Sequence, residues 1–472
     1  MLIPFAGAVA ATLFAAFQST PESPPQLTME HLDLEVTIDY DAGTLDGHAL
    51  LTVANVGLGP VTVVPVQLGR LMRVTDVGVG GRRASFTQDI ITYEDWGSYQ
   101  LNQVYVEIEP SISPGASAEI AVAYEGYLVP YTETGMLYVR DHVSPEFTML
   151  RQEALAWPSL GVPSRRITRS MPAGDFTFRL GISVPSDQVV AAAVPPIVET
   201  RAGGYTTWKF ESAAPVPFLN IPIAPYTLLQ RGAVRIFHFP SDSGGAAVVL
   251  NAIEQTLRRY TEWFGPIEQA AAVTIMEIPE GWGSQANLAA GVILTADAFH
   301  SPRSLPALYH ELAHFWHPTD TGDPPVRWNE GLATLLQHRV AAVQDNGPAL
   351  TSAMEDRAAR IVAAGNDTPR ASVALIDYGR LGLTDLSYST GALMLYALYT
   401  NLGEDRFDGL LAGYFDTFRS TGSDTDQFVE YVSTQSGEDL TRFFRDWVYT
   451  TAWYTRLASG ETLHEVITSY RE

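Results

Sequence analysis

The sequence predicts an α+β chain of more than one domain, with an N-terminal β-sandwich or saddle-like sheet domain at 27–231 and a mostly α-helical domain at 232–472. Three observations support this. The chain has 472 residues, which is too long for one ordinary hydrophobic core. From Leu27 to Leu229, apolar and polar residues alternate with the period of a half-buried strand. From about Ile236 onward, apolar residues recur at helical spacing.

Several segments of the first domain have the strand pattern and are separated by turn residues such as Gly, Pro, Asn and Asp. They are 31–40, 47–56, 61–66, 103–110, 117–126, 176–185 and 205–212. One more strand is predicted at 234–239, where the second domain begins. Helices are then predicted at 245–265, 305–317, 329–343, 391–402 and 440–453.

Composition argues against several functions. The chain has 53 acidic and 29 basic residues, a net charge of -24, which argues against nucleic acid and anionic membrane surfaces as partners. It has no cysteine, so it contains neither disulfides, nor a thiolate metal site, nor a cysteine nucleophile. Any bound metal must therefore take His, Asp or Glu as ligands.

The first 26 residues resemble a signal peptide or N-terminal anchor followed by a linker. An apolar run extends from Leu2 to Phe17, and a Ser/Pro-rich stretch follows from Ser19 to Pro25. We therefore expect an extracytoplasmic protein, which is secreted, periplasmic or anchored, with membrane contact only through this segment. The alternative is a tail that packs on the protein.

The segment HELAH carries the strongest chemical signal, with His310, Glu311 and His314 in the pattern H-E-x-x-H. Histidines four residues apart lie on one helix face, so both imidazoles can bind one cation. Glu330 follows a loop rich in Pro and Gly, at the start of the next predicted helix. Two histidines and a carboxylate form a catalytic zinc site that leaves the fourth position to water. The pattern predicts one Zn²⁺ per chain, and a pair of helix histidines without metal is the alternative.

Such a site hydrolyses amides. Zinc lowers the pKa of its water toward about 7 and polarises a carbonyl group. Glu311 would then take the proton of the water as general base and return it to the leaving amine.

The pair HELAH and WNEGLA resembles the aminopeptidase N (membrane alanyl aminopeptidase) family of gluzincin metallopeptidases, which usually have HELAHQW and WLNEGFA. In that family a β saddle domain precedes a thermolysin-like catalytic domain. The stretches at 31–57, 263–268 and 387–398 are similar to the family as well. The resemblance implies a zinc peptidase in which Tyr388 donates a hydrogen bond to the oxyanion.

The sequence departs from the family where a G-x-M-E-N strand normally binds substrate. The Glu of that motif holds the free α-amino group of the substrate. The corresponding substrate-binding stretch here is Gly283, Ser284, Gln285, Ala286 and Asn287. Ala286 replaces the amine anchor, so selection of a free N-terminus is not expected to be strong. Glu277, Glu280 and Glu153 are candidate substitutes, although each is better explained as an ordinary structural or surface carboxylate.

The resemblance is to a short form of the family. After Tyr388 there is no room for the large helical C-terminal domain that closes the active site in many members. We therefore expect a more open cleft, which makes larger peptides and internal peptide bonds plausible substrates. Two other functions remain open because fold does not fix chemistry: a peptide-binding or assembly module that keeps the zinc fold without turnover, and a hydrolase of non-peptide substrates.

Overall fold

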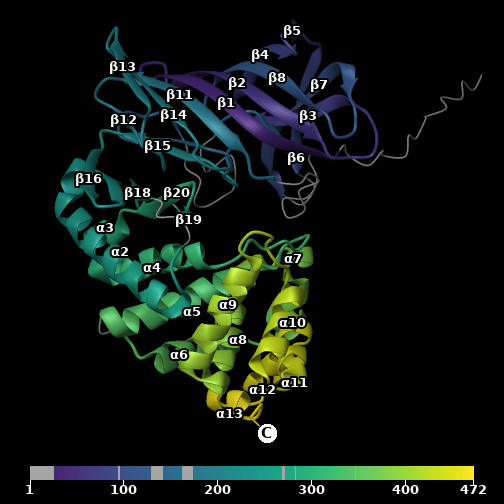
Figure 1. Cartoon of the computed structure of the whole chain (residues 1–472), viewed down its shortest axis with the longest axis vertical. Coiled ribbons are helices and arrows are strands. Elements are labelled where there is room, and N and C mark those ends of the chain that lie inside the picture. The colour runs from purple at the N-terminus through teal and green to yellow at the C-terminus, as the bar shows by residue number, and fades with distance from the viewer. Residues whose placement is uncertain are drawn as a thin grey trace, which may run out of the picture.

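The computed structural model describes residues 26–93, 96–128, 142–161, 174–267, 272–281, 283–345 and 347–471. A β domain and a helical domain lie one above the other, and the chain passes from the first to the second (Figure 1). The predicted fold class is confirmed, since an N-terminal part with several sheets precedes a largely helical part. The apolar run at 2–17 and its linker lie outside the described residues.

Two sheets enclose the core of the β domain. The larger sheet has the strand order β13 (Val198–Ala202), β14 (Tyr205–Glu211), β11 (Thr177–Pro185), β1 (Leu27–Asp39), β2 (Thr44–Asn55), β8 (Ser117–Gly126), β4 (Met72–Val79) and β5 (Arg82–Arg83). The smaller sheet is β10 (Ser159–Leu160), β3 (Val61–Gly69), β7 (Trp96–Ile112) and β6 (Phe86–Tyr93). Along β1, Leu32, Leu34, Val36 and Ile38 are buried in the core between the sheets, as their alternation predicts.

A third, small sheet connects the two domains. It consists of β12 (Val189–Val190), β15 (Asn220–Ala224) and β9 (Thr148–Arg151). Its apolar residues share a buried cluster with strands of the second domain, in which Met149 and Ala224 join Phe237, Met276 and Ile293. Burial of this cluster holds the β domain against the sheet that borders the site.

The second domain begins with a five-stranded sheet that the residue pattern did not predict. Its order is β16 (Thr227–Arg231), β17 (Val234–His238), β18 (Val273–Ile278), β20 (Gly291–Thr295) and β19 (Gln285–Asn287). The central strands are parallel, and every residue of β17, β18 and β20 is buried. Strands covered on both faces are mostly apolar and show no alternation, as in β18 and β20. A strand was predicted at β17 because Arg235 and His238 interrupt its apolar residues.

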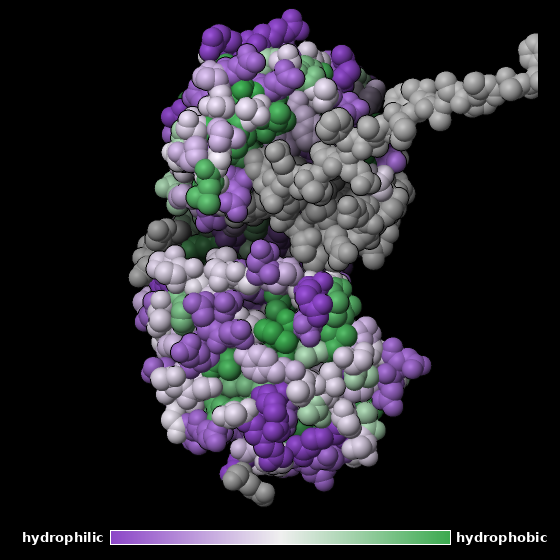
Figure 2. Space-filling model, turned by 90° about the vertical axis from the view of Figure 1, so that its right-hand side faces the viewer, coloured by the Kyte–Doolittle hydropathy of each residue, from purple (hydrophilic) through white to green (hydrophobic). Residues whose placement is uncertain are grey.

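Helical segments form the rest of the domain. They are η1 (Pro240–Asp242), α2 (Ser243–Phe264), α3 (Asp297–His300), η2 (Pro302–Ser304), α4 (Leu305–Ala313), η3 (His314–Trp316), α5 (Trp328–Gln344), α6 (Leu350–Ala363), η4 (Pro369–Ala371), η5 (Leu375–Asp377), α7 (Tyr378–Leu381), η6 (Thr384–Leu386), α8 (Ser387–Leu402), α9 (Glu404–Phe418), α10 (Thr425–Ser436), α11 (Thr441–Phe444), η7 (Arg445–Tyr449), α12 (Ala452–Ala458) and α13 (Leu463–Thr468). Over the described residues, none of these helices combines the length and the apolar character needed to span a membrane. On the face seen in Figure 2, hydrophobic residues gather on the part of the helical domain that lies next to the β domain.

Helices α5 and α8 approach each other closely because both carry glycine at the crossing. A Cβ built on Gly331 would lie 2.5 Å from the Cα atom of Gly391, and one on Gly391 would lie 3.1 Å from that of Gly331. Side chains at these positions would force the helices apart. The crossing places Glu330 on one helix near Tyr388 on the other.

Candidate metal centre

Three side chains from consecutive helical segments converge on one point. His310 lies in α4, His314 begins η3, and Glu330 lies in the first turn of α5. Oε2 of Glu330 is 3.2 Å from Nε2 of His310 and 3.4 Å from Nε2 of His314. These ligand atoms all lie within 4.8 Å of one another, which makes the three residues a candidate metal centre.

This donor set fits zinc. A tetrahedral Zn²⁺ ion with bonds of about 2.0–2.2 Å keeps neighbouring ligands about 3.3–3.5 Å apart. The two separations from Glu330, 3.2 and 3.4 Å, are close to that value. The buried Glu330 carboxylate also compensates much of the charge of a divalent cation.

A second ring of polar groups orients the histidines. Nδ1 of His310 lies 3.1 Å from Oε1 of Gln337, and Nδ1 of His314 lies 2.7 Å from Nε2 of His317. Such contacts set the tautomer, so that Nε2 of each ring is free to bind metal. Nδ1 of His317 in turn lies 2.8 Å from the carbonyl oxygen of Pro318, which fixes the orientation of its ring.

The sequence analysis missed Gln337 and Arg327. Gln337 lies two turns after Glu330 on the same face of α5, so a search of that face would have found it. Arg327 precedes α5 in the left-handed region, at φ 61°, and its guanidinium contacts Glu330. Its backbone N–H donates to Asp320, which holds the loop between the two ligand helices. No local pattern indicates this conformation, because it arises from the fold of that loop.

Charge in the site is balanced around Glu330. Burial raises the pKa of its carboxyl, but His314, His310 and Arg327 outweigh burial and hold that pKa well below the usual value. For His314, burial lowers the pKa and Glu330 raises it, and the net shift is upward. Burial beside His314 lowers the pKa of His317 to about 4, so its ring is neutral at pH 7. The carboxylate is therefore ionised and available to a cation.

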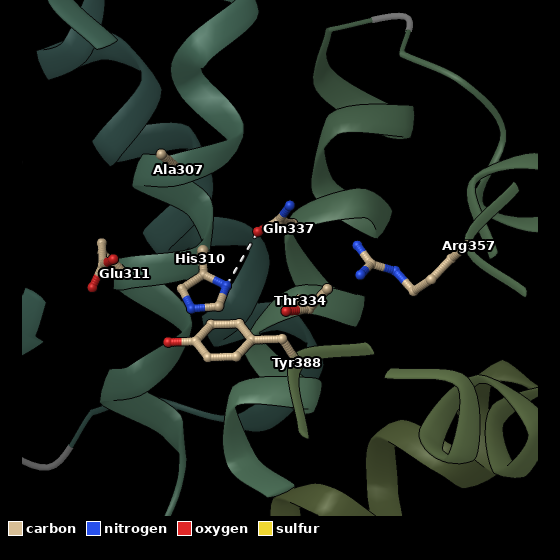
Figure 3. A pocket seen from close by; sticks show the side chains of 7 residues that line it. All are labelled: Ala307, His310, Glu311, Thr334, Gln337, Arg357 and Tyr388. Carbon is tan, nitrogen blue, oxygen red and sulfur yellow. Dashed lines mark hydrogen bonds between the residues drawn. The ribbon is translucent and has the colours of Figure 1, made fainter. Parts of the chain in front are cut away.

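Glu311 and Tyr388 border a pocket beside these ligands. The pocket has a volume of about 300 Å³ and is lined from α4 by Ala307, His310 and Glu311. Thr334 and Gln337 of α5, Arg357 of α6 and Tyr388 of α8 complete it (Figure 3).

Burial shifts the pKa of both groups in the same direction, upward. The ring of Tyr388 stacks on His310, with centroids 5.6 Å apart and planes at 9°. Burial and the nearby Glu330 raise the pKa of Tyr388, so its hydroxyl stays protonated and is a hydrogen-bond donor. Burial also raises the pKa of Glu311.

The stretch Gly283–Asn287 lies next to the centre, but most of its polar side chains have structural partners. Strand β19 is the edge strand of the five-stranded sheet and lies against α4 and η3. Oε1 of Gln285 accepts from Asn220, Oδ1 of Asn287 accepts from two backbone N–H groups of the following turn, and Oγ of Ser284 accepts from Thr295 N–H. Ala286 is half-buried against the helical core.

The glutamates weighed as substitute amine anchors are engaged elsewhere. Oε2 of the buried Glu277 accepts from Phe239 N–H, and Glu280 pairs with His300. Glu277, Asp242 and His300 bring ligand-type atoms within 4.8 Å of one another, separately from the centre at Glu330. Glu153 lies 3.7 Å from Arg151 in the β domain. None of the three lines the pocket beside His310.

A β domain joined to a helical domain that carries two histidines and a glutamate on successive helical segments is the arrangement expected for a zinc metallopeptidase, the class that the motifs predict. Comparison with known proteins specifies this class further. The chain has the fold of the M1 zinc metallopeptidases, and the family resemblance seen in its motifs is confirmed at the level of the fold.

Two solved structures illustrate the likeness. An M1 zinc metallopeptidase from Deinococcus radiodurans, bound to the substrate Tyr-Ser-Ala, superimposes with a TM-score of 0.65 and 21% identity, over 90% of this chain and 94% of that one. Yeast LTA4 hydrolase in complex with bestatin gives a TM-score of 0.63 at 14% identity, over 92% of this chain and 70% of that one.

Sequence comparison also finds a relative of similarly low identity. Aminopeptidase M1-B of Oryza sativa subsp. japonica is 21% identical over 307 residues, which is 58% of this chain. The chain spans about a third (34%) of the length of that enzyme. No protein-family model matches the chain.

Proposed function

We propose that the chain is a zinc-dependent peptidase with an aminopeptidase-like catalytic site. The observation that carries this proposal is the convergence of His310, His314 and Glu330 beside a pocket that is also lined by Glu311 and Tyr388. A non-catalytic module would not need a general base and a hydroxyl donor at the same pocket. The fold of the M1 zinc metallopeptidases supports the same interpretation.

His310, His314 and Glu330 would hold one zinc ion. When bound, zinc would lower the pKa of a water molecule and polarise the scissile carbonyl group. Gln337 and His317 keep the two imidazoles oriented for this role.

The other residues move the proton and stabilise charge. Glu311 accepts a proton from the attacking water and delivers it to the nitrogen of the leaving amine. The Tyr388 hydroxyl donates a hydrogen bond to the carbonyl oxygen as negative charge develops on it. Both groups line the same pocket, which supports their action on one peptide carbonyl.

Selection of a free N-terminus is proposed to be weak. Ala286 carries no charge where a carboxylate would bind the substrate ammonium group, and the neighbouring polar side chains of β19 already have partners. The glutamates considered as replacements do not line the pocket. Peptides with blocked N-termini are therefore expected among the substrates.

The test is mass spectrometry of a diverse peptide mixture after incubation with the zinc-loaded full chain, comparing free with acetylated N-termini. We expect cleavage of both sets, and loss of about 10²–10⁴-fold in rate for Glu311→Gln, as for removal of a general base. Absence of cleavage by metal-loaded protein would refute the proposal. Stoichiometric peptide binding without products would favour the non-catalytic module, and turnover of esters alone would favour a non-peptide hydrolase.

Export belongs to the same proposal but rests on the sequence pattern of residues 1–26, which lie outside the described residues. N-terminal sequencing of the protein recovered from soluble and membrane fractions of an expressing cell distinguishes cleavage from anchoring. A cytoplasmic protein with an intact N-terminus would contradict it.

A further inference from the structure

The pocket beside the metal centre contains an arginine that neither the proposed metal chemistry nor the general base requires. Arg357 projects from α6, and in Figure 3 its guanidinium group points toward Gln337 and Thr334, on the opposite side of His310 from Glu311. A volume of about 300 Å³ is at the lower end of the range for small-ligand pockets. It suits a short piece of substrate rather than a long peptide.

The contacts of Arg357 involve only uncharged groups. Its Nη1 donates to Oγ of Ser389 at 2.9 Å, and its Nη2 lies 3.1 Å from Nε2 of His338. Burial and nearby arginines lower the pKa of His338 to about 4, so this imidazole is neutral and can accept the hydrogen bond. Nε of Arg357 is buried and has no hydrogen-bond partner. The guanidinium therefore keeps its full charge, with no carboxylate among these contacts.

No carboxylate of the described residues pairs with Arg357. The charged side chains nearest to it, Arg360 and Arg370, are also cations. Neither of them forms an ion pair with any residue that the structure describes. In contrast, the buried Arg339 is bound by both Asp408 and Glu404. Among the described residues, carboxylates therefore pair with the structural Arg339, and none pairs with the arginine of this pocket. An uncompensated guanidinium in a partly desolvated pocket is a receptor for an anion.

The position of Glu311 indicates which part of a substrate meets this arginine. Under the proposed function, Glu311 delivers its proton to the leaving amine, so the residue that contributes this amine enters the pocket that Glu311 lines. Ala307, one turn before His310, leaves room at the wall of this pocket.

We propose that Arg357 binds a carboxylate on the substrate residue that follows the scissile bond, and that the protein prefers peptides that carry one. This inference rests on the proposed peptidase function and specifies its substrate class. The carboxylate is either the C-terminus of a peptide cleaved at its last bond or the side chain of Asp or Glu at that position. Both present the planar, two-oxygen group that a guanidinium recognises.

The test compares peptides that differ only in this group. In the first pair, the residue that follows the cleaved bond is the last of the peptide, and its C-terminus is either a free carboxylate or an amide. In the second pair, the residue that follows the cleaved bond is Glu or Gln within a longer peptide. In the pair that matches the natural origin of the carboxylate, C-terminal or side-chain, we expect about 10- to 100-fold higher kcat/KM for the carboxylate member. The difference should lie mostly in KM, because a hydrogen bond to a charged group stabilises the complex by a free energy of that size. The pair that responds identifies the source.

Arg357→Gln should abolish the preference, so that the carboxylate and uncharged members of each pair are hydrolysed at equal rates. Arg360→Gln is the matched control, because it removes the same charge from the exposed side of the same helix. It should keep the preference. Equal rates on carboxylate and uncharged members, or a preference that survives Arg357→Gln, would overturn the inference.

Failure of the inference is distinguishable from failure of the proposed function. If wild-type protein hydrolyses peptides without regard to the carboxylate, only the inference fails. If it hydrolyses none, calorimetric titration of zinc-loaded Glu311→Gln protein with the same pairs still decides whether the carboxylate binds. Thermal unfolding of each variant shows whether it has folded.

Discussion

Replacement of Gly331 by alanine tests how the helix crossing positions the site. The new Cβ would lie 2.5 Å from the Cα and carbonyl carbon of Gly391 and 2.6 Å from the backbone nitrogen of Ala392. Carbon atoms in favourable contact are about 3.5–4.0 Å apart, so α5 and α8 must separate by about 1 Å. Glu330 precedes Gly331 on one helix and Tyr388 lies one turn before Gly391 on the other, so the shift moves a proposed metal ligand and the proposed oxyanion donor.

The expected magnitudes follow from these distances. Overpacking of a core costs about 1–3 kcal/mol, and alanine recovers about 0.8–1.0 kcal/mol of helix propensity relative to glycine. The net loss in free energy of unfolding should be up to about 2 kcal/mol, measured by denaturant titration. A displacement of about 1 Å between groups that act on one substrate can lower kcat by about 10²-fold, measured on the best peptide from the mixture.

Gly409→Ala is the control for this change. Gly409 lies on the exposed side of α9, and no atom comes within 4 Å of a Cβ built there. This variant should be about 0.5–1 kcal/mol more stable than wild type, with unchanged activity. Wild-type stability and kcat in Gly331→Ala would refute the argument that the glycine crossing positions the site.

Three further predictions concern the polar groups. Gln337→Leu removes the hydrogen-bond partner of His310 and should weaken zinc binding by about 10–100-fold, as measured by competition with a chelator. Unchanged zinc affinity would show that Gln337 does not orient His310. Zinc at 100 times its dissociation constant should stabilise wild type and Glu311→Gln alike by about 2.7 kcal/mol but not His314→Ala, as read from thermal unfolding with and without chelator. Burial raises the pKa of Glu277 to about 9 from an ordinary 4.5, so the folded chain keeps a proton that the unfolded chain releases, and stability falls as pH rises between these values. Glu277→Gln should therefore gain stability relative to wild type between pH 5 and pH 8 in denaturant titrations, and a constant difference would contradict the assignment.

Local patterns predicted the parts of the fold in which one face is buried. The strands of the β domain alternate, as β1 does with Leu32, Leu34, Val36 and Ile38 in the core, so each was recognisable alone. The helices of the second domain carry apolar residues at helical spacing for the same reason. The two buried parallel strands β18 and β20 lack any such contrast, and pairing between distant segments defines them.

The sequence by itself determined the two-part architecture and the candidate ligands, because H-E-x-x-H and the later glutamate act through helix periodicity and residue chemistry that are local properties. Only the tertiary structure decided what surrounds them. Gln337 reaches His310 because the chain folds α4 against α5, and Arg357 enters the pocket because α6 packs beside that pair. Such contacts join segments that are far apart in the sequence, so their physical origin is the packing of helices around the core rather than a pattern in any one of them.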